Sequence, residues 1–228
     1  MTAVDLPRLY LITDRRLVPG GDLATAVEAA LHGGARLIQL REKDLLGGAL
    51  FRLAESLRTL TDKYNARLLI NDRVDVAAAV GADGAHLGSQ GIAIRDARAI
   101  LGGDALIGYS AHSREEALVA SRLGADVVTL GPVFPTRKEF QAPLLGLDGL
   151  QEACGELPAP VFALGGINAQ NAGGALEAGA KGVALISFVF ADRDPEARTR
   201  EILQVIEQYA PPEPIPKKGY HLRRMRSQ

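Results

Sequence analysis

The chain has few of the residues that mark special classes of protein. It contains one cysteine, Cys154, no tryptophan and 5% aromatic residues over 228 positions. A single cysteine excludes an intramolecular disulfide and a cysteine-based zinc site, which suits a reducing compartment. No apolar run approaches the length that spans a membrane, and the N-terminus lacks a basic-then-apolar signal pattern. We therefore expect a cytoplasmic protein with no membrane partner.

The net charge is close to zero but unevenly distributed. Lys and Arg number 26 against 27 Asp and Glu, for a formal charge of −1. Five of the cations and one acid fall within residues 211–228, so the remainder carries about −5. An acidic body argues against a nucleic-acid partner. We expect residues 1–210 to form the folded domain and the proline-rich, then basic tail (residues 211–228) to be a disordered extension.

Eight short apolar runs alternate with segments of helical spacing. The runs cover residues 9–14, 37–41, 67–71, 84–87, 106–110, 127–131, 161–165 and 182–187. Strict alternation predicts a parallel sheet, and eight units at this length predict a single α/β domain, a (β/α)₈ TIM barrel. An open doubly wound sheet is the alternative, but no Gly-x-Gly-x-x-Gly follows the first run.

Polar residues at alternate positions end the second apolar run. In an extended chain Gln39, Arg41 and Lys43 face one side, and Leu40 and Glu42 face the other. An amide followed by two cations can contact a heterocycle and then hold an anion. A strand end with solvated charges would show the same pattern.

Other polar residues also stand where strands end, which is where barrel enzymes place their active sites. Asn71 and Asp72 suit a heterocycle contact beside one Mg²⁺ ligand, although Asp72 would equally serve as the N-cap of the next helix. Ser110 ends the fifth run, and His112 lies just past it. His112 has the chemistry of a general acid or base, and a solvated structural histidine is the alternative.

The last two runs suggest a phosphate site. Gly165 and Gly166 turn from the seventh run toward a helix, and Ser187 closes the eighth run. In (β/α)₈ barrels a phosphate commonly lies between these two loops, where glycine lets an anion approach the main chain. A plain tight turn is the alternative reading.

Seven motifs occur in an order that resembles one known family. They are LYLITD (9–14), QLREK (39–43), INDRVD (70–75), GAHLG (84–88), GYSAHS (108–113), GPVFPT (131–136) and ALGGI (163–167). Together they resemble the thiamine phosphate synthase/TenI superfamily over about residues 9–209. The resemblance implies a TIM barrel of thiamine biosynthesis. A synthase of this family joins hydroxymethylpyrimidine diphosphate to hydroxyethylthiazole phosphate and releases diphosphate.

The resemblance also implies roles for the pyrimidine half of the site. Gln39 and Asn71 would contact the pyrimidine, while Arg41 and Lys43 would hold the diphosphate. Asp72 would bind Mg²⁺.

The same resemblance extends to the other substrate. Ser110 would lie beside the reacting diphosphate. Thr136, with the Gly166 and Ser187 loops, would place the thiazole phosphate.

Two positions depart from the family pattern. The usual Gln-Glu-Asp after His-Leu-Gly is Ser-Gln-Gly here, so Gly91 replaces a second Mg²⁺ ligand. The usual phosphate-loop lysine is Glu139, which leaves Arg137 or Lys138 to replace it. Both changes weaken the metal and diphosphate machinery.

Those departures bring in two alternatives to the synthase. A TenI-type thiazole tautomerase aromatises a thiazole carboxylate phosphate by proton transfer, for which His112 would shuttle the proton without Mg²⁺. A non-catalytic barrel would bind thiazole phosphate without turnover. Five residues expected of a synthase are present and favour that activity: Gln39, Arg41, Lys43, Asn71 and Asp72. The partners of a synthase would be its small-molecule substrates. The sequence does not decide between a monomer and a homo-oligomer.

Overall fold

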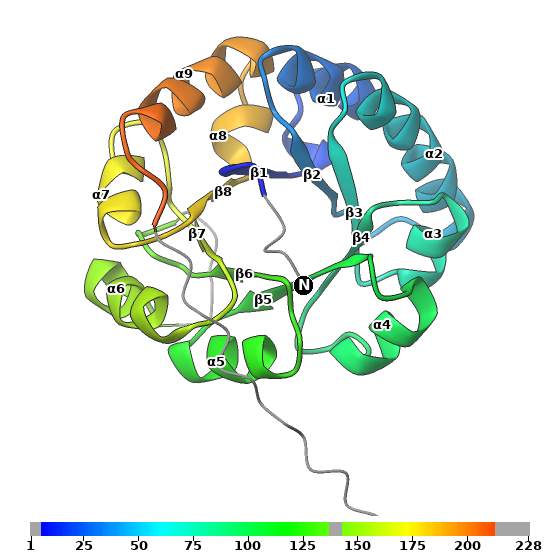
Figure 1. Ribbon diagram of the computed structural model, residues 1–228. Coiled ribbons are helices and arrows are strands. Elements are labelled where there is room, and N and C mark those ends of the chain that lie inside the picture. Colours follow the sequence, from blue (N-terminus) through cyan, green and yellow to red (C-terminus); the bar gives the residue numbers. More distant parts are fainter. Residues whose placement is uncertain (1–5, 137–142, 213–228) are drawn as a thin grey trace, which may run out of the picture.

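Eight parallel strands close into a barrel in the order of the sequence (Figure 1). The computed structural model describes residues 6–136 and 143–212. The strands are β1 (Leu9–Ile12), β2 (Leu37–Leu40), β3 (Arg67–Asn71), β4 (Gly84–Leu87), β5 (Leu106–Ala111), β6 (Val127–Leu130), β7 (Val161–Leu164) and β8 (Gly182–Leu185). The (β/α)₈ barrel predicted from the alternation is confirmed.

Helices surround the strands as an outer ring (Figure 1). They are α1 (Leu23–His32), α2 (Gly47–Lys63), α3 (Val74–Ala79), α4 (Ile94–Leu101), α5 (Arg114–Arg122), α6 (Gly146–Glu156), α7 (Ala172–Glu177), α8 (Ser187–Phe190) and α9 (Pro195–Glu207), with a 3₁₀ turn η1 (Arg15–Leu17). Asp22, Ser113 and Asp194 cap α1, α5 and α9 by accepting backbone N–H bonds. These caps satisfy N–H groups that a helix start leaves unpaired.

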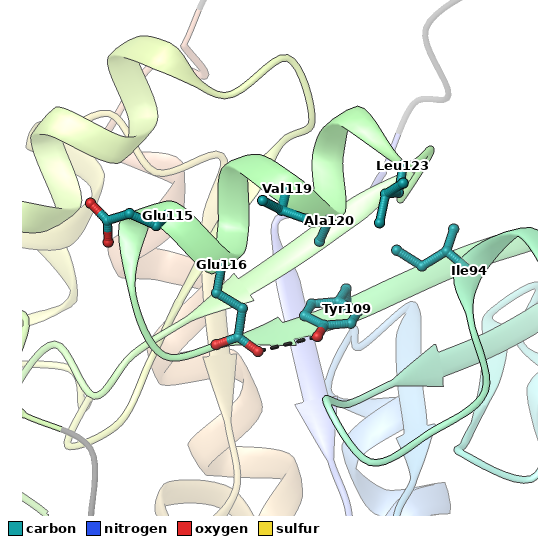
Figure 2. Close-up of a pocket in the computed structure, with 7 residues that line it drawn as sticks. All are labelled: Ile94, Tyr109, Glu115, Glu116, Val119, Ala120 and Leu123. Atoms are coloured by element: carbon teal, nitrogen blue, oxygen red, sulfur yellow. Dashed lines mark hydrogen bonds between the residues drawn. The ribbon is translucent and has the colours of Figure 1, made fainter.

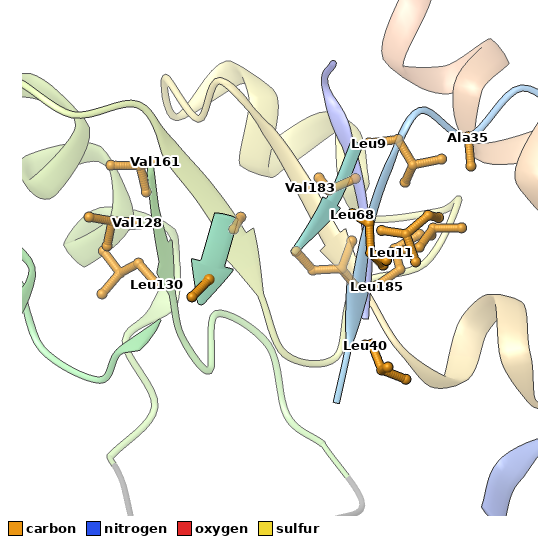
Figure 3. Packing of buried hydrophobic residues seen from close by; sticks show 14 of the residues in the cluster. Leu9, Leu11, Ala35, Leu40, Leu68, Val128, Leu130, Val161, Val183 and Leu185 are labelled. Atoms are coloured by element: carbon orange, nitrogen blue, oxygen red, sulfur yellow. The ribbon is translucent and has the colours of Figure 1, made fainter. Parts of the chain in front are cut away.

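Both faces of each strand are buried, and they feed two separate cores. In β1, Leu9 and Leu11 pack against the surrounding helices, while Tyr10 and Ile12 point into the barrel. Figure 3 shows part of the outer core, with side chains of several strands, among them Leu9, Val183 and Leu185. This two-sided burial explains why the strands have continuous apolar sequences.

Arg8 connects three parts of the chain at the floor of the barrel, where the strands begin. Its Nε donates to the carbonyl of Lys181 at 3.0 Å, just before β8. Its Nη1 donates to the carbonyls of Ile206, at 3.1 Å, and Tyr209, at the end of α9. The first strand, the last strand and the last helix are thereby held together.

The structure corrects one predicted boundary near the C-terminus. β8 ends at Leu185, so Ser187 begins the short helix α8 instead of closing the strand. The segment from Gly166 to α7 contains a turn, in which the Asn168 carboxamide accepts the backbone N–H groups of Gln170 and Asn171, and α7 begins at Ala172.

The C-terminal tail and the possibility of a membrane-spanning helix remain to be considered. The predicted tail, beyond its first two residues, lies outside the described part of the chain, so its disorder stays a prediction. Within the described residues, every helix is too short or too polar to cross a bilayer.

Candidate active site

The β2 strand and the segment after it place three predicted residues at increasing exposure. Gln39 lies inside the barrel with 1% of its surface exposed. Its Nε2 donates to the hydroxyl oxygen of Tyr10 at 2.9 Å, which leaves Oε1 as the acceptor atom of this side chain. Arg41 follows the strand end and is half-buried, and Lys43 is exposed. The amide therefore lies deep and the cations lie at the mouth.

Glu42 has a structural role that the sequence did not indicate. It is 4% exposed and accepts the Thr13 hydroxyl at 2.7 Å. It also accepts the backbone N–H of Arg15 at 3.1 Å and an Arg15 guanidinium N–H at 3.1 Å. The carboxylate thus joins the segment after β1 to the segment after β2 and positions Arg41 between them.

The electrostatic surroundings of Arg41 combine burial with two carboxylates. Burial lowers the pKa of Arg41, and the charges of Asp14 and Asp72 act in the opposite direction. An arginine remains protonated under such shifts. A partly desolvated cation therefore lies near Asp72, where it can bind an anion more strongly than a surface arginine would.

Asp72 is not the helix cap that was considered from the sequence. The N-cap of α3 is Arg73, which makes no side-chain capping bond. Asp72 has a left-handed backbone with φ of 55°. Its Oδ2 accepts from Asn71 Nδ2 at 2.9 Å, and its Oδ1 accepts the Gly88 N–H at 3.0 Å. Such backbone strain is concentrated at functional sites, and here it fixes a carboxylate between the ends of β3 and β4.

Gly91 faces this same carboxylate. A Cβ atom placed on Gly91 would lie 2.9 Å from Oδ1 of Asp72. A side chain at position 91 would therefore reach the Asp72 site, and glycine removes any second carboxylate there. Within the described residues no three His, Cys, Asp or Glu side chains converge on a metal position. One carboxylate together with diphosphate and water oxygens is nevertheless a donor set that Mg²⁺ accepts.

A buried polar chain runs beneath the mouth of the barrel. Tyr10 Oη lies 3.0 Å from His86 Nδ1, and His86 Nε2 lies 3.0 Å from Ser110 Oγ. Thr129 donates to Ser110 Oγ at 3.3 Å. Burial, together with the charge of Arg41, lowers the pKa of His86 to about 3, so its imidazole is neutral at pH 7. His86 lies in the fourth apolar run, and the sequence does not indicate its role because Tyr10 is remote in the chain.

His112 lies past the end of β5, where protein groups hold its backbone and its ring. Its backbone N–H donates to Glu116 Oε2 at 2.8 Å, and Nδ1 lies 3.2 Å from the carbonyl of Gly131. Because a carbonyl only accepts, Nδ1 is protonated and a neutral ring presents Nε2 as an acceptor. His112 borders a cavity of about 430 Å³ that Arg114 and Leu145 also line.

The loops after β6 and β7 pack backbone against backbone. Gly165 and Gly166 have φ of 94° and 67°, and a Cβ on Gly166 would lie 2.5 Å from the carbonyl oxygen of Pro135. Only glycine permits this approach, which brings the loop carrying Thr136 against the Gly166 turn. Thr136 and Ser187 are exposed at the strand ends. Lys138 lies outside the described residues.

A second hollow lies on the outer side of β5, between α4 and α5, and has a volume of about 260 Å³. Tyr109 in its wall donates to Glu116 at 3.1 Å, and Figure 2 shows the residues that line it. Ile94, Val119 and Leu123 make its walls mainly apolar. None of the predicted site residues lines it, so we place the candidate site at the mouth of the barrel.

The fold and the residues at the mouth of the barrel together indicate a class of enzyme. A (β/α)₈ barrel with cations, a fixed carboxylate and glycine turns at its strand ends is typical of enzymes that act on phosphorylated small molecules. A family model described as thiamine monophosphate synthase matches residues 9–189. The chain belongs to the thiamine monophosphate synthase family, as its motifs predicted.

Individual relatives agree with the family over nearly the whole chain. A protein of Geobacter sulfurreducens is 52% identical over 207 residues, which cover 90% of this chain and 97% of that protein. The thiamine-phosphate synthase of Clostridium novyi is 42% identical over 87% of this chain and 98% of its own. The solved structure of a thiamine phosphate pyrophosphorylase from Pyrococcus furiosus has a TM-score of 0.82 at 41% identity, covering 88% of this chain and 96% of that one.

Proposed function

We propose that this chain is a thiamine-phosphate synthase. It condenses hydroxymethylpyrimidine diphosphate with hydroxyethylthiazole phosphate to give thiamine phosphate and diphosphate. Relatives that are 36–52% identical over most of the chain, several of them named thiamine-phosphate synthase, support this activity. The substrates are small phosphorylated molecules, which fit a mouth lined with cations.

The residues of β2 and the segment after it would act on the pyrimidine diphosphate. Oε1 of Gln39 would accept from the pyrimidine amine, with Asn71 on the neighbouring strand end. Arg41 and Lys43 would bind the diphosphate. The bond from carbon to the diphosphate oxygen breaks, and its electron pair leaves with the diphosphate. Fixed cations and the Ser110 hydroxyl stabilise this negative charge as it develops.

The second substrate would be held by the last loops of the barrel. The thiazole phosphate would be held by Thr136, Gly166 and Ser187. Lys138, two positions after Thr136 in the sequence, would add a positive charge. The thiazole nitrogen then donates its lone pair to the methylene carbon that carried the diphosphate and forms the new carbon–nitrogen bond. Positioning of both partners supplies much of the rate enhancement in such a reaction.

We further propose that Asp72 is the protein's ligand for Mg²⁺. The carboxylate is held by Asn71 and Gly88 but keeps lone pairs for a metal. Mg²⁺ bound there would neutralise charge on the diphosphate. Asp72 would be the one carboxylate ligand. Oxygens of the substrate and of water would take the place of the second carboxylate, which is absent because residue 91 is glycine.

The observation that carries the choice of synthase is the constrained carboxylate of Asp72. A thiazole tautomerase moves a proton and needs no such group, and a helix cap would have explained the residue without a metal. Asp72 does not cap α3, because its oxygens accept from Asn71 and Gly88 instead.

The deciding experiment uses two reactions on one purified sample. The first contains pyrimidine diphosphate, thiazole phosphate and Mg²⁺ and is scored for thiamine phosphate and diphosphate. The second contains only the non-aromatic thiazole tautomer. We expect turnover in the first; aromatisation in the second alone would assign the chain to the tautomerases.

Removal of Arg41 tests the diphosphate assignment. Arg41→Ala should reduce synthase kcat/KM by at least about 100-fold, because it removes a charge that acts on the leaving group. Arg95→Ala, which removes an exposed arginine on α4, is the matched control and should leave kcat/KM unchanged. His112→Ala should have the opposite selectivity and impair any tautomerase activity. Full synthase activity in Arg41→Ala would show that the diphosphate binds elsewhere.

A further inference from the structure

The hydrogen bonds under the barrel mouth have a direction that follows from one amide nitrogen. Gln39 Nε2 can only donate, so the oxygen of Tyr10 accepts from it. The single hydroxyl hydrogen of Tyr10 is then directed to Nδ1 of His86, 3.0 Å away. A neutral imidazole that accepts at Nδ1 carries its hydrogen on Nε2. His86 therefore donates to Ser110.

Ser110 is at the end of this chain of hydrogen bonds. Its Oγ accepts from His86 Nε2 at 3.0 Å and from Thr129 Oγ1 at 3.3 Å. These two bonds use both lone pairs of the hydroxyl oxygen, so its hydrogen is the group left to donate. His86 and Thr129 are fully buried while Ser110 is only partly so, which places the donor on the side of the barrel mouth.

The backbone is built to accommodate the imidazole. Gly108 lies opposite His86 on β5, and a Cβ there would be 2.2 Å from Nδ1. The Tyr10 ring lies 5.6 Å from the His86 ring, and Tyr10 in turn contacts Phe162 edge-on at 5.9 Å. The ring of His86 thus has one position, and the groups bonded to its two nitrogens set which of them carries the hydrogen.

We propose that Tyr10, His86 and Thr129 are positioning residues that orient the Ser110 hydroxyl as a hydrogen-bond donor to the leaving diphosphate. The inference rests on the proposed synthase activity for the identity of the anion. The direction of the hydrogen bonds rests on the structure alone. In the opposite direction, Ser110 would donate to His86, as a serine does when a histidine serves as its base.

The imidazole tautomer in the free protein tests the direction without any substrate. Long-range ¹H–¹⁵N correlation spectra of histidine-labelled protein at pH 7 distinguish the two tautomers, and His86→Gln identifies the signal that is lost. We expect hydrogen on Nε2 only. Hydrogen on Nδ1, or exchange between both tautomers, would overturn the proposal.

A kinetic cycle tests whether the buried groups act through Ser110. Thr129→Val should lower synthase kcat by about 5- to 10-fold with a small change in KM, the effect of one hydrogen bond made in the transition state. Tyr10→Phe should lower kcat to a similar degree and also raise KM for the pyrimidine diphosphate, because it removes the hydroxyl to which Gln39 donates. In a Ser110→Ala background neither substitution should lower kcat further, since coupled residues are not additive. Equal effects in both backgrounds would indicate a merely structural role and overturn the proposal.

One control variant tests whether loss of any tyrosine hydroxyl would lower kcat. Tyr64→Phe removes a tyrosine hydroxyl that bonds Glu28 at 3.4 Å on the outer surface, and should leave kcat unchanged. If the wild-type protein forms no thiamine phosphate, the proposed function fails. The inferred direction of the hydrogen bonds is then still decided by the tautomer spectrum, and the inferred anion by titration of inorganic diphosphate, which Ser110→Ala should weaken about 5-fold or more.

Discussion

At the scale of single residues, His86 couples the stability of the barrel to pH. Its folded-state pKa is about 3, against about 6.5 for an unfolded histidine. Between these values the unfolded chain binds the extra proton, so stability rises with pH and is lost as pH falls below 6.5. We expect the unfolding free energy to drop by about 1.4 kcal/mol per pH unit from pH 6 to pH 5 on account of this group.

Urea unfolding of wild type and His86→Gln across pH 5–8 measures this effect. The variant lacks the titrating ring. The difference in unfolding free energy between the two proteins should therefore change with pH as predicted for His86. His32 is an exposed histidine and stays in both proteins. Parallel pH profiles for wild type and variant would contradict a buried neutral imidazole.

Residue roles were predictable from sequence where the signal is local. Alternation along one strand was enough to separate Gln39 from Leu40. The choice between metal ligand and helix cap at Asp72 was not, because it depends on a left-handed backbone and on the N–H of Gly88, 16 residues away. The partners of His86 are also distant, and its own segment reads as a plain apolar strand.

At the scale of elements, the turn after β4 determines how Asp72 is presented. A methyl group on Gly91 would press on the carboxylate at 2.9 Å and on the Gly88 carbonyl at 3.2 Å. We expect Gly91→Ala to raise the Mg²⁺ concentration for half-maximal synthase activity about 3- to 10-fold, because the carboxylate must move. Its cost in stability should be about 1 kcal/mol.

Gly103→Ala is the matched control for that substitution. It lies in the turn between α4 and β5, where an added methyl group would have no atom within 4 Å, and should leave the Mg²⁺ dependence unchanged. A Gly91→Ala protein with the wild-type Mg²⁺ dependence would separate this turn from the metal.

The types of element were predictable, and some of their ends were not. The apolar runs and the helical spacing between them gave the order of strands and helices, because both patterns are local. Residues 183–190 are almost continuously apolar, and a short apolar run fits a strand or a buried helix equally well. For that reason the change from β8 to α8 before Ser187 was missed.

At the scale of the whole molecule, Arg8 is the residue that joins the two ends of the barrel. Arg8→Ala should lower the unfolding free energy by about 2 kcal/mol, since it removes charge-assisted bonds to three carbonyls. Hydrogen exchange should show the loss mainly in α9. Arg36→Ala, which removes a guanidinium that bonds the nearby carbonyls of Leu31 and Ala35, should leave α9 protected.

The overall architecture was the most predictable level. Strict alternation of apolar runs and helical segments permits few topologies, and right-handed parallel connections reduce them further. The polar layer inside the barrel was not predictable, because it arises only when strands far apart in sequence close into a ring.

The contact between Arg8 and Tyr209 also indicates that the chain can be circularly permuted. Residues that open and close the barrel meet on the floor, opposite the proposed site, so a short peptide could link them covalently. A circular permutant joined there and opened between Gly102 and Gly103 would keep every strand-to-helix loop intact. Such a permutant, which omits the basic tail, is expected to retain turnover and would present both new termini for fusion on the face away from substrate.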